Sequence, residues 1–170
     1  MRQHTWRTIG VLGAALIAGP AAADLLAGKV VGVSDGDTVT VLTEEHVQVK
    51  VRIAGIDAPE KGQPFGQAAK SSMSGCAFGK QAQVEWKKLD RYGRTIGKLT
   101  VDGLDCGRRQ VEMGFAWHYK AYAREQLAED RQAYAKAETA ARAASKGLWR
   151  DAHPTPPWDY RHPARSEAAP

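Results

Sequence analysis

The chain has 170 residues, of which 43% are hydrophobic and 25% are charged, and its formal net charge is +5. This length suffices for one domain with a single core. The basic excess is mild, since Arg2 and Arg7 near the start account for part of it. A net charge of this size excludes a strongly basic tail that binds nucleic acid.

Residues 1–23 have the features of a secretory signal peptide. Arg2 and Arg7 give a positive start, residues 9–18 form an apolar run too short to span a bilayer comfortably, and alanines 21–23 offer a small-residue cleavage site. An uncleaved membrane anchor is the alternative. The sequence therefore predicts an exported protein, periplasmic or secreted, with no membrane segment after cleavage.

Three runs with period-two alternation follow between residues 28 and 53, and they predict half-buried strands. In the third run apolar residues alternate with Lys50 and Arg52, so the Arg52 side chain should point away from the apolar face. Asp35-Gly36 lies between the first two runs. It predicts a tight two-residue hairpin turn in which glycine supplies a positive φ.

Carboxylates gather at the ends of these runs, at Asp35, Asp37, Asp57 and Glu60. Taken singly, each has a structural alternative, such as a turn residue or the acidic first turn of a helix. Together they form a set of hard oxygen ligands, which suits Ca²⁺ or Mg²⁺ better than zinc. Arg52 between them could hold a phosphate through two parallel N–H donors. This combination is what phosphodiester hydrolysis requires.

The middle of the chain predicts a helix, two strands and a turn. Proline at 64 is compatible with a helical first turn, and apolar spacing continues through Phe65, Ala69, Met73 and Cys76 until Gly79 breaks it. Alternation over residues 81–87 predicts a fourth strand. Residues 90–94 resemble a turn, and residues 96–101 predict a fifth strand.

Two helices are predicted after the fifth strand. Asp105 is a suitable N-cap for a short helix that runs to Met113 and is ended by Gly114. A longer helix, ended by Gly147, has an apolar stripe with a seven-residue period at Leu127, Tyr134, Ala141 and Leu148. The proline-rich tail, residues 150–170, has too little apolar content for a core of its own, but Trp158 and Tyr160 could fold back onto the domain.

The two cysteines, Cys76 and Cys106, both lie after the predicted signal peptide. In an exported protein such a pair is a candidate disulfide, whereas a buried Cys76 thiol is the alternative. No clustered Cys and His spacing indicates a zinc site. Several basic residues follow the acidic cluster in the chain. They suit a polyanionic ligand or an ordinary solvated surface: Lys87, Lys88, Arg91, Arg94, Lys98, Arg108, Arg109 and Lys120.

Five short strands with about three helices, and without strand–helix–strand alternation, fit a small closed barrel of the α+β class, mainly β. Four segments of the chain also resemble the successive blocks of the thermonuclease family of staphylococcal or micrococcal nuclease-like proteins: DGDTV (35–39), RIAGIDAPE (52–60), DRYGR (90–94) and GFAWHYK (114–120). The resemblance covers roughly residues 28–149 and implies a five-stranded OB-fold barrel. The domain should thus span residues 24–149.

The resemblance also implies roles for individual residues. Asp37 and Asp57 would bind Ca²⁺ through their side chains and Ala58 through its backbone carbonyl, although many family members have threonine at this last position. Asp35 would hold metal-bound water. Glu60 would act as general base for the attacking water or orient it. Two arginines, Arg52 and Arg94, would bind the scissile phosphate and stabilise its transition-state charge.

Four further residues match family positions that touch the neighbouring phosphate and base: Arg91, Tyr92, Trp117 and Tyr119. Stacking on aromatic rings tolerates any base. For Trp117, packing in the core is the alternative.

The sequence therefore predicts an exported, monomeric, Ca²⁺-dependent nuclease that cuts DNA and RNA with little sequence specificity and, by resemblance, leaves 3′-phosphate ends. A non-catalytic nucleic-acid- or protein-binding module of the same fold is one alternative. A Ca²⁺-binding domain of the cell envelope is another, but it leaves the arginines without a role.

Overall fold

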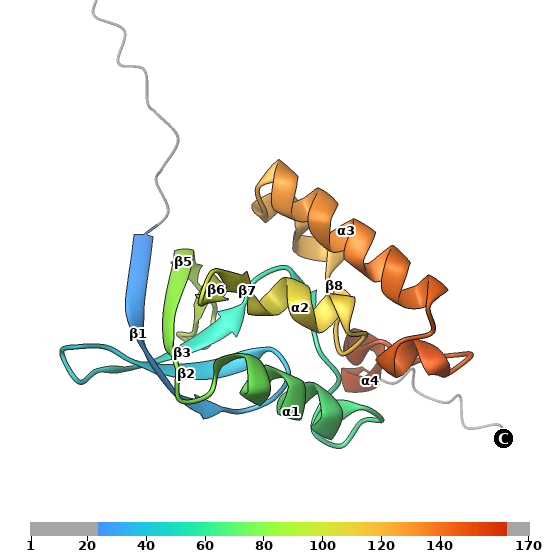
Figure 1. The fold of residues 1–170 in the computed structure, drawn as a ribbon, viewed down its shortest axis with the longest axis horizontal. Helices are drawn as coiled ribbons and strands as arrows, with labels where there is room; N and C mark the ends of the chain where they lie inside the picture. Colours follow the sequence, from blue (N-terminus) through green and yellow to red (C-terminus); the bar gives the residue numbers. More distant parts are fainter. Residues whose placement is uncertain (1–23, 163–170) are drawn as a thin grey trace, which may run out of the picture.

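The computed structural model describes residues 24–162, and within this range five longer strands form a closed barrel (Figure 1). They are β1 (Asp24–Val33), β2 (Thr38–Leu42), β3 (Gln48–Ile53), β5 (Gln81–Leu89) and β6 (Thr95–Val101). Antiparallel pairing joins β3 to β2, β2 to β1, β1 to β5 and β5 to β6. A parallel pairing of β3 with β6 closes the ring. The predicted five-stranded OB-fold barrel is confirmed.

The alternating residues of the strands fill the barrel as the pattern predicts. In β6 every second residue is buried, from Thr95 to Val101, and Val39, Val41 and Val51 of β2 and β3 are fully buried. Burial of each of these valines stabilises the fold by roughly 1.5–3 kcal/mol. Gly97 permits the close approach of β5 to β6, because a Cβ there would lie 2.5 Å from a side-chain methyl of Val84.

The helices lie to one side of the barrel, with α2 (Cys106–Glu112) packed against both α1 (Gly66–Ala77) and α3 (Ala128–Ala143) (Figure 1). Shorter elements complete the described part: β4 (Ile56–Asp57), β7 (Leu104–Asp105), β8 (Trp117–His118), α4 (Pro157–Arg161) and the 3₁₀ helices η1 (Lys120–Glu125) and η2 (Gly147–Arg150). Strand β4 pairs with β8, which places the end of the 52–57 segment beside α3, because β8 also contacts that helix.

The start of α2 is fixed in two ways. Asp105 caps the helix as predicted, its side chain accepting a hydrogen bond from the Arg108 backbone N–H at 2.9 Å. A disulfide joins Cys76 near the end of α1 to Cys106, the first residue of α2, so the candidate bridge is present. The cap fixes the first turn of α2, and the disulfide holds α2 against α1.

Three local predictions were wrong. The helix α1 begins at Gly66, two residues after Pro64, because Phe65 takes a left-handed conformation at the N-cap. The helix α3 ends at Ala143, and Gly147 instead opens the 3₁₀ helix η2. The turn at Asp35-Gly36 does connect β1 to β2, but it spans residues 34–37 and its glycine has no positive φ.

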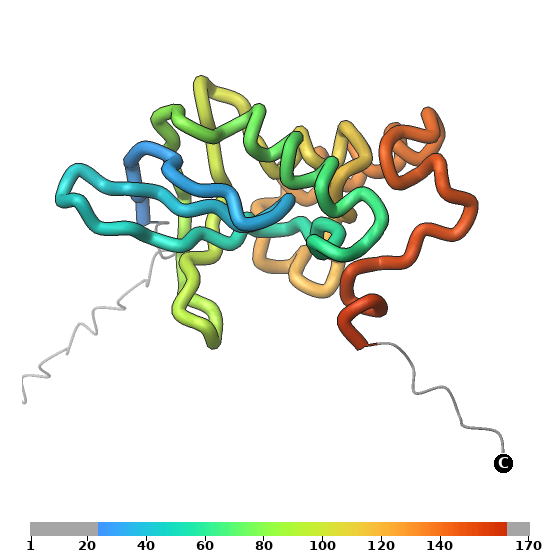
Figure 2. The backbone as a smooth tube through the Cα atoms, turned by 90° about the horizontal axis from the view of Figure 1, so that it is seen from below, coloured from blue at the N-terminus to red at the C-terminus, as the bar shows by residue number. Residues whose placement is uncertain are grey.

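Part of the predicted tail packs against the domain, although the tail has too little apolar content for a core of its own. Residues 155–161 return to the domain, and Figure 2 shows the end of the described chain alongside the loop that precedes α1. Trp158 packs against the aromatic cluster around Trp117, as predicted for this residue. The predicted signal peptide, residues 1–23, lies outside the described residues. Across residues 24–162 no helix has the length and apolar character that crossing a bilayer would demand.

Candidate active site

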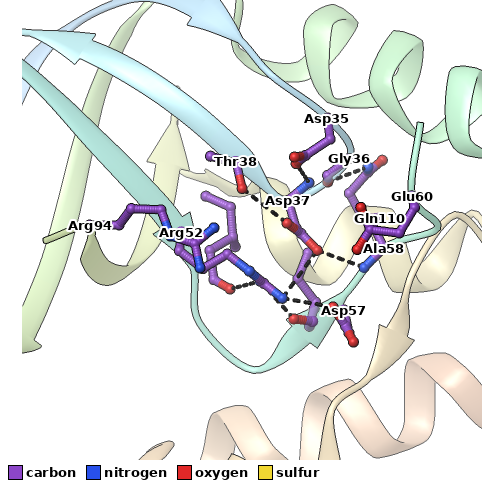
Figure 3. Close-up of polar contacts among 12 residues, drawn as sticks. Asp35, Gly36, Asp37, Thr38, Arg52, Asp57, Ala58, Glu60, Arg94 and Gln110 are labelled. Carbon is purple, nitrogen blue, oxygen red and sulfur yellow. Dashed lines mark hydrogen bonds and ion pairs between the residues drawn. The ribbon is translucent and has the colours of Figure 1, made fainter. Parts of the chain in front are cut away.

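The acidic side chains come from two loops that meet at one end of the barrel (Figure 3). Asp37 lies at the mouth of β2, and Asp57 ends the short strand β4. Both are buried, with 6% and 1% of their surface exposed. Two buried carboxylates at one place need compensating positive charge, because desolvation penalises the ionised form.

Arg52 supplies part of that charge and fixes the two carboxylates relative to each other. Its Nη2 donates to Asp57 Oδ1 at 2.8 Å and lies 3.2 Å from Asp37 Oδ2. Its Nη1 donates to the backbone carbonyls of Ile53 and Ile56, each at 2.8 Å. The guanidinium is therefore held at four points, and the prediction that Arg52 points away from the apolar face is confirmed.

Asp37 is the most perturbed carboxylate of the group. Its oxygens accept hydrogen bonds from the Ala58 backbone N–H at 2.7 Å and from the Thr38 hydroxyl at 3.2 Å. Burial raises the pKa of Asp37 to about 7, Arg52 opposes this rise, and repulsion from Asp35 adds to it. Asp35 in turn accepts a hydrogen bond from the Asp37 backbone N–H at 3.1 Å, which shapes the loop. The carboxylate of Asp37 is therefore stabilised either by a bound proton or by a further cation beside it.

The loop that carries Asp37 is held by a residue that sequence reasoning missed. Gln110 of α2 is 1% exposed, and its Nε2 donates to the carbonyls of Gly36 at 2.8 Å and Ala69 at 2.9 Å. An amide at a buried position of α2 was the available signal, because such a group needs hydrogen-bond partners inside the protein. Gln110 thus ties the acidic loop to both α1 and α2.

Glu60 lies at the edge of this cluster, and a second missed residue contacts it. Arg161 of α4 donates from Nη1 to Glu60 Oε1 at 2.7 Å and from Nη2 to Asp57 Oδ2 at 2.7 Å. Glu60 and Asp57 are 101 and 104 residues away from Arg161 in sequence, so no local spacing could have indicated the contact. The Glu60 side chain remains 38% exposed, which leaves it open to water.

Arg94 approaches the same region from the loop between β5 and β6, and Figure 3 shows its side chain directed toward Arg52. Asp90 orients it by accepting hydrogen bonds from the Arg94 backbone N–H at 2.9 Å and from its Nε at 2.7 Å. Burial alone would raise the pKa of Asp90, but the hydrogen bonds from Arg94 and Tyr92 hold it below its usual value. Tyr92 is 68% exposed, with the Arg91 guanidinium 4.8 Å from its ring centre.

The aromatic residues expected to contact substrate divide into two groups. Trp117 is 4% exposed and packs edge-on against Trp149 and Trp158, with ring centres 5.3 and 6.1 Å away. In this structure the packing alternative describes Trp117, because only 4% of its surface is exposed, and stacking on a base stays a prediction. Tyr119 is half-buried and stacks on Trp158, with ring centres 5.3 Å apart and planes at 23°. Tyr92 and Tyr119 are therefore the two predicted substrate-contacting aromatic residues that keep some exposed surface.

The donor set fits a hard divalent cation, although residues 24–162 contain no group of three or more Asp, Glu, His or Cys side chains with metal-binding geometry. An oxygen of Asp37 and an oxygen of Asp57 already share one nitrogen of Arg52, so both can approach a single cation. Two carboxylates and the carbonyl of Ala58 would leave positions for water and substrate, as Ca²⁺ prefers.

Comparison with known proteins gives consistent matches. A family model described as "Staphylococcal nuclease homologue" matches residues 50–151. The chain is 38% identical over 133 residues to an "Uncharacterized endonuclease" of Haemophilus influenzae, covering 78% of this chain and 71% of that protein. It is 35% identical over 169 residues to a "Micrococcal nuclease" of Shigella flexneri, covering 94% of each. It is also 37% identical over 165 residues to "Protein ParB" of Escherichia coli, covering 91% and 89%.

Proposed function

Since the chain belongs to the family of staphylococcal nuclease homologues, we propose that it is a Ca²⁺-dependent endonuclease that hydrolyses phosphodiester bonds of DNA and RNA with little sequence specificity. The observation that carries this proposal is the convergence of Asp37 and Asp57 on one nitrogen of Arg52. A binding module would not need two buried carboxylates and an arginine at one point, because burying them is unfavourable.

The cation would be held by Asp37, Asp57 and the carbonyl of Ala58. When bound, Ca²⁺ supplies a positive charge that polarises a phosphoryl oxygen. The protein contributes the fixed positions of its ligands: Arg52 and the Ala58 N–H hold the carboxylates, and Gln110 holds the loop that carries Asp37.

Arg52 and Arg94 would stabilise the charge that develops on the phosphate oxygens during in-line attack. Their donors face the acidic site from two different elements, β3 and the loop between β5 and β6 (Figure 3). Glu60, with its exposed carboxylate, would accept a proton from the attacking water or orient it. By family resemblance, cleavage on the 5′ side of the phosphate would leave 3′-phosphate ends.

Broad substrate range is supported by the groups around the site. Arg91 offers a sequence-independent contact to phosphate, and the rings of Tyr92 and Tyr119 offer stacking worth roughly 1–3 kcal/mol for each base. We include export in the proposal, with the protein acting as a monomer in the periplasm or outside the cell. Its support is the signal-like sequence of residues 1–23 and the disulfide between Cys76 and Cys106.

Digestion of single- and double-stranded DNA and of RNA, in Ca²⁺ and then in a chelator, tests the proposal. We expect cleavage in Ca²⁺ only, and a loss of about 10² or more in rate for Asp37→Ala and Arg94→Ala. Arg109→Ala, an exposed arginine of α2, is the matched control. Equal activity of the wild type and both site variants would overturn the assignment.

The role of Glu60 needs a separate measurement. Glu60→Gln should lower kcat by roughly 10²–10⁴ with a small change in KM, because positioned proton transfer acts in the transition state. Glu44→Gln, at an exposed turn, is the control that makes the same chemical change away from the site.

Mass analysis of the products should show phosphate on the 3′ ends, and phosphate on the 5′ ends would contradict that part of the proposal.

A further inference from the structure

The last described segment, residues 155–162, which we term the C-terminal arm, lies on the candidate active site through three separate contacts. Its first residue, Thr155, accepts a hydrogen bond at its carbonyl from Gln63 Nε2. In its middle, Trp158 stacks on Tyr119, and near its end Arg161 enters the acidic cluster. Figure 2 shows this segment beside the loop that carries Glu60.

Arg161 occupies oxygens that a cation would need. It contacts Oδ2 of Asp57 at 2.7 Å and Oδ1 at 3.3 Å, while Arg52 holds the same Oδ1 at 2.8 Å. Both oxygens of Asp57 therefore face guanidinium hydrogens, and Asp57 is only 1% exposed. A divalent cation binds through the lone pairs of these oxygens, so Arg161 and the cation cannot hold Oδ2 in the same way at the same time.

Trp158 occupies a second surface that the proposed reaction needs. Its ring is nearly parallel to that of Tyr119, at 23° and with centres 5.3 Å apart, which is the geometry of a stacked pair. While Trp158 lies there, a nucleobase cannot stack on that face of Tyr119. The Arg161 guanidinium thus occupies the place where the carboxylates would bind the metal ion. The Trp158 ring occupies the face of Tyr119 on which a base would stack.

We propose that the C-terminal arm is an intramolecular competitor that Ca²⁺ and the polynucleotide displace from the active site. The proposal rests on the proposed nuclease function of this site. Displacement is feasible because a divalent cation would neutralise the same buried carboxylate, while the Arg161 side chain, 38% exposed, can be hydrated as it leaves the 1% exposed Asp57. A cation that binds only the arm-released state has its apparent affinity lowered by the fraction of molecules in that state.

Calorimetric titration of the full chain with CaCl₂, without nucleic acid, tests this competition. Arg161→Gln should bind Ca²⁺ about tenfold more tightly than the wild type, since a tenfold change corresponds to one modest charge-assisted hydrogen bond. Trp158→Ala loosens the arm without changing any charge and should also tighten Ca²⁺ binding severalfold. Arg150→Gln, an exposed arginine that makes no ion pair within residues 24–162, is the control for lost charge and should stay within about twofold.

Hydrogen exchange gives a readout that does not depend on affinity. Adding CaCl₂ to the wild type should raise deuterium uptake in the peptide that covers residues 155–162, whereas the same peptide of Arg161→Gln should exchange fast in both conditions.

Equal Ca²⁺ affinities of the wild type and Arg161→Gln, or no Ca²⁺ binding by either, overturn the proposal. Tighter binding by Arg161→Gln without any gain in Trp158→Ala overturns it as well, because only a long-range charge effect then remains. The nuclease proposal fails separately, if Ca²⁺ binds as described and no nucleic acid is cut.

Discussion

Gly36 offers a test of how closely the two acidic loops must approach. It lies between Asp35 and Asp37, and a Cβ added to it would lie 2.6 Å from the Cβ of Ala58 and 2.7 Å from that of Ala69. Its φ is not in the left-handed region, so Gly36→Ala would introduce a steric clash without backbone strain.

The size of the effect follows from these distances. Carbon atoms in contact prefer separations of about 3.5–4.0 Å, so the loop must move by roughly 1 Å away from Ala58 and α1. Ala58 follows Asp57 directly, and its N–H holds the carboxylate of Asp37. Movement of the loop therefore separates the proposed metal ligands. We expect a loss of stability of about 1–3 kcal/mol from overpacking and a loss of about 10² in kcat from misplaced groups.

The assay combines urea unfolding with steady-state cleavage of single-stranded DNA in saturating Ca²⁺. Gly75→Ala is the matched control, because it makes the same change inside α1 where nothing lies within 4 Å of the new Cβ. That control should gain roughly 0.5–1 kcal/mol of stability and keep its activity. Wild-type kcat and Ca²⁺ affinity in a folded Gly36→Ala protein would refute the argument that this close approach forms the site.

Three further predictions concern charged and polar groups. Because burial raises the pKa of Asp37 from 3.8 to about 7, the native state binds a proton that the unfolded state has released in this window. In a chelator, wild-type stability relative to Asp37→Asn should thus fall as pH rises from about 4 to 7, by up to roughly 1.4 kcal/mol for each pKa unit, and parallel pH profiles would contradict this. Asp90→Ala frees Arg94 and should lower kcat about tenfold or more while the melting temperature falls by only a few degrees, and unchanged kcat would argue against its positioning role. Tyr134→Phe removes the hydroxyl that contacts both oxygens of buried Asp105 at 2.9 Å, and denaturant unfolding should show a loss of about 1.5–3 kcal/mol.

Local sequence patterns were sufficient to predict the strands of the barrel and some of the residues at the candidate site. Strand alternation is a property of neighbouring residues, so the strands, the buried valines and the outward direction of Arg52 could be predicted from spacing alone. The same holds for Asp105 as a helix cap. Predictions that depended on how a segment continues, such as the start of α1 after Pro64 or the end of α3 near Gly147, were wrong by a few residues.

By itself the sequence determined which residue types could do the chemistry and which strands would present them, because both follow from side-chain identity and short-range periodicity. Only the tertiary structure decided how these residues are partnered. Burial of Trp117, the link from Gln110 to the acidic loop and the entry of Arg161 into the cluster each join segments far apart in the chain. Such contacts depend on how whole elements pack against one another, and packing of that kind leaves no spacing pattern along the chain.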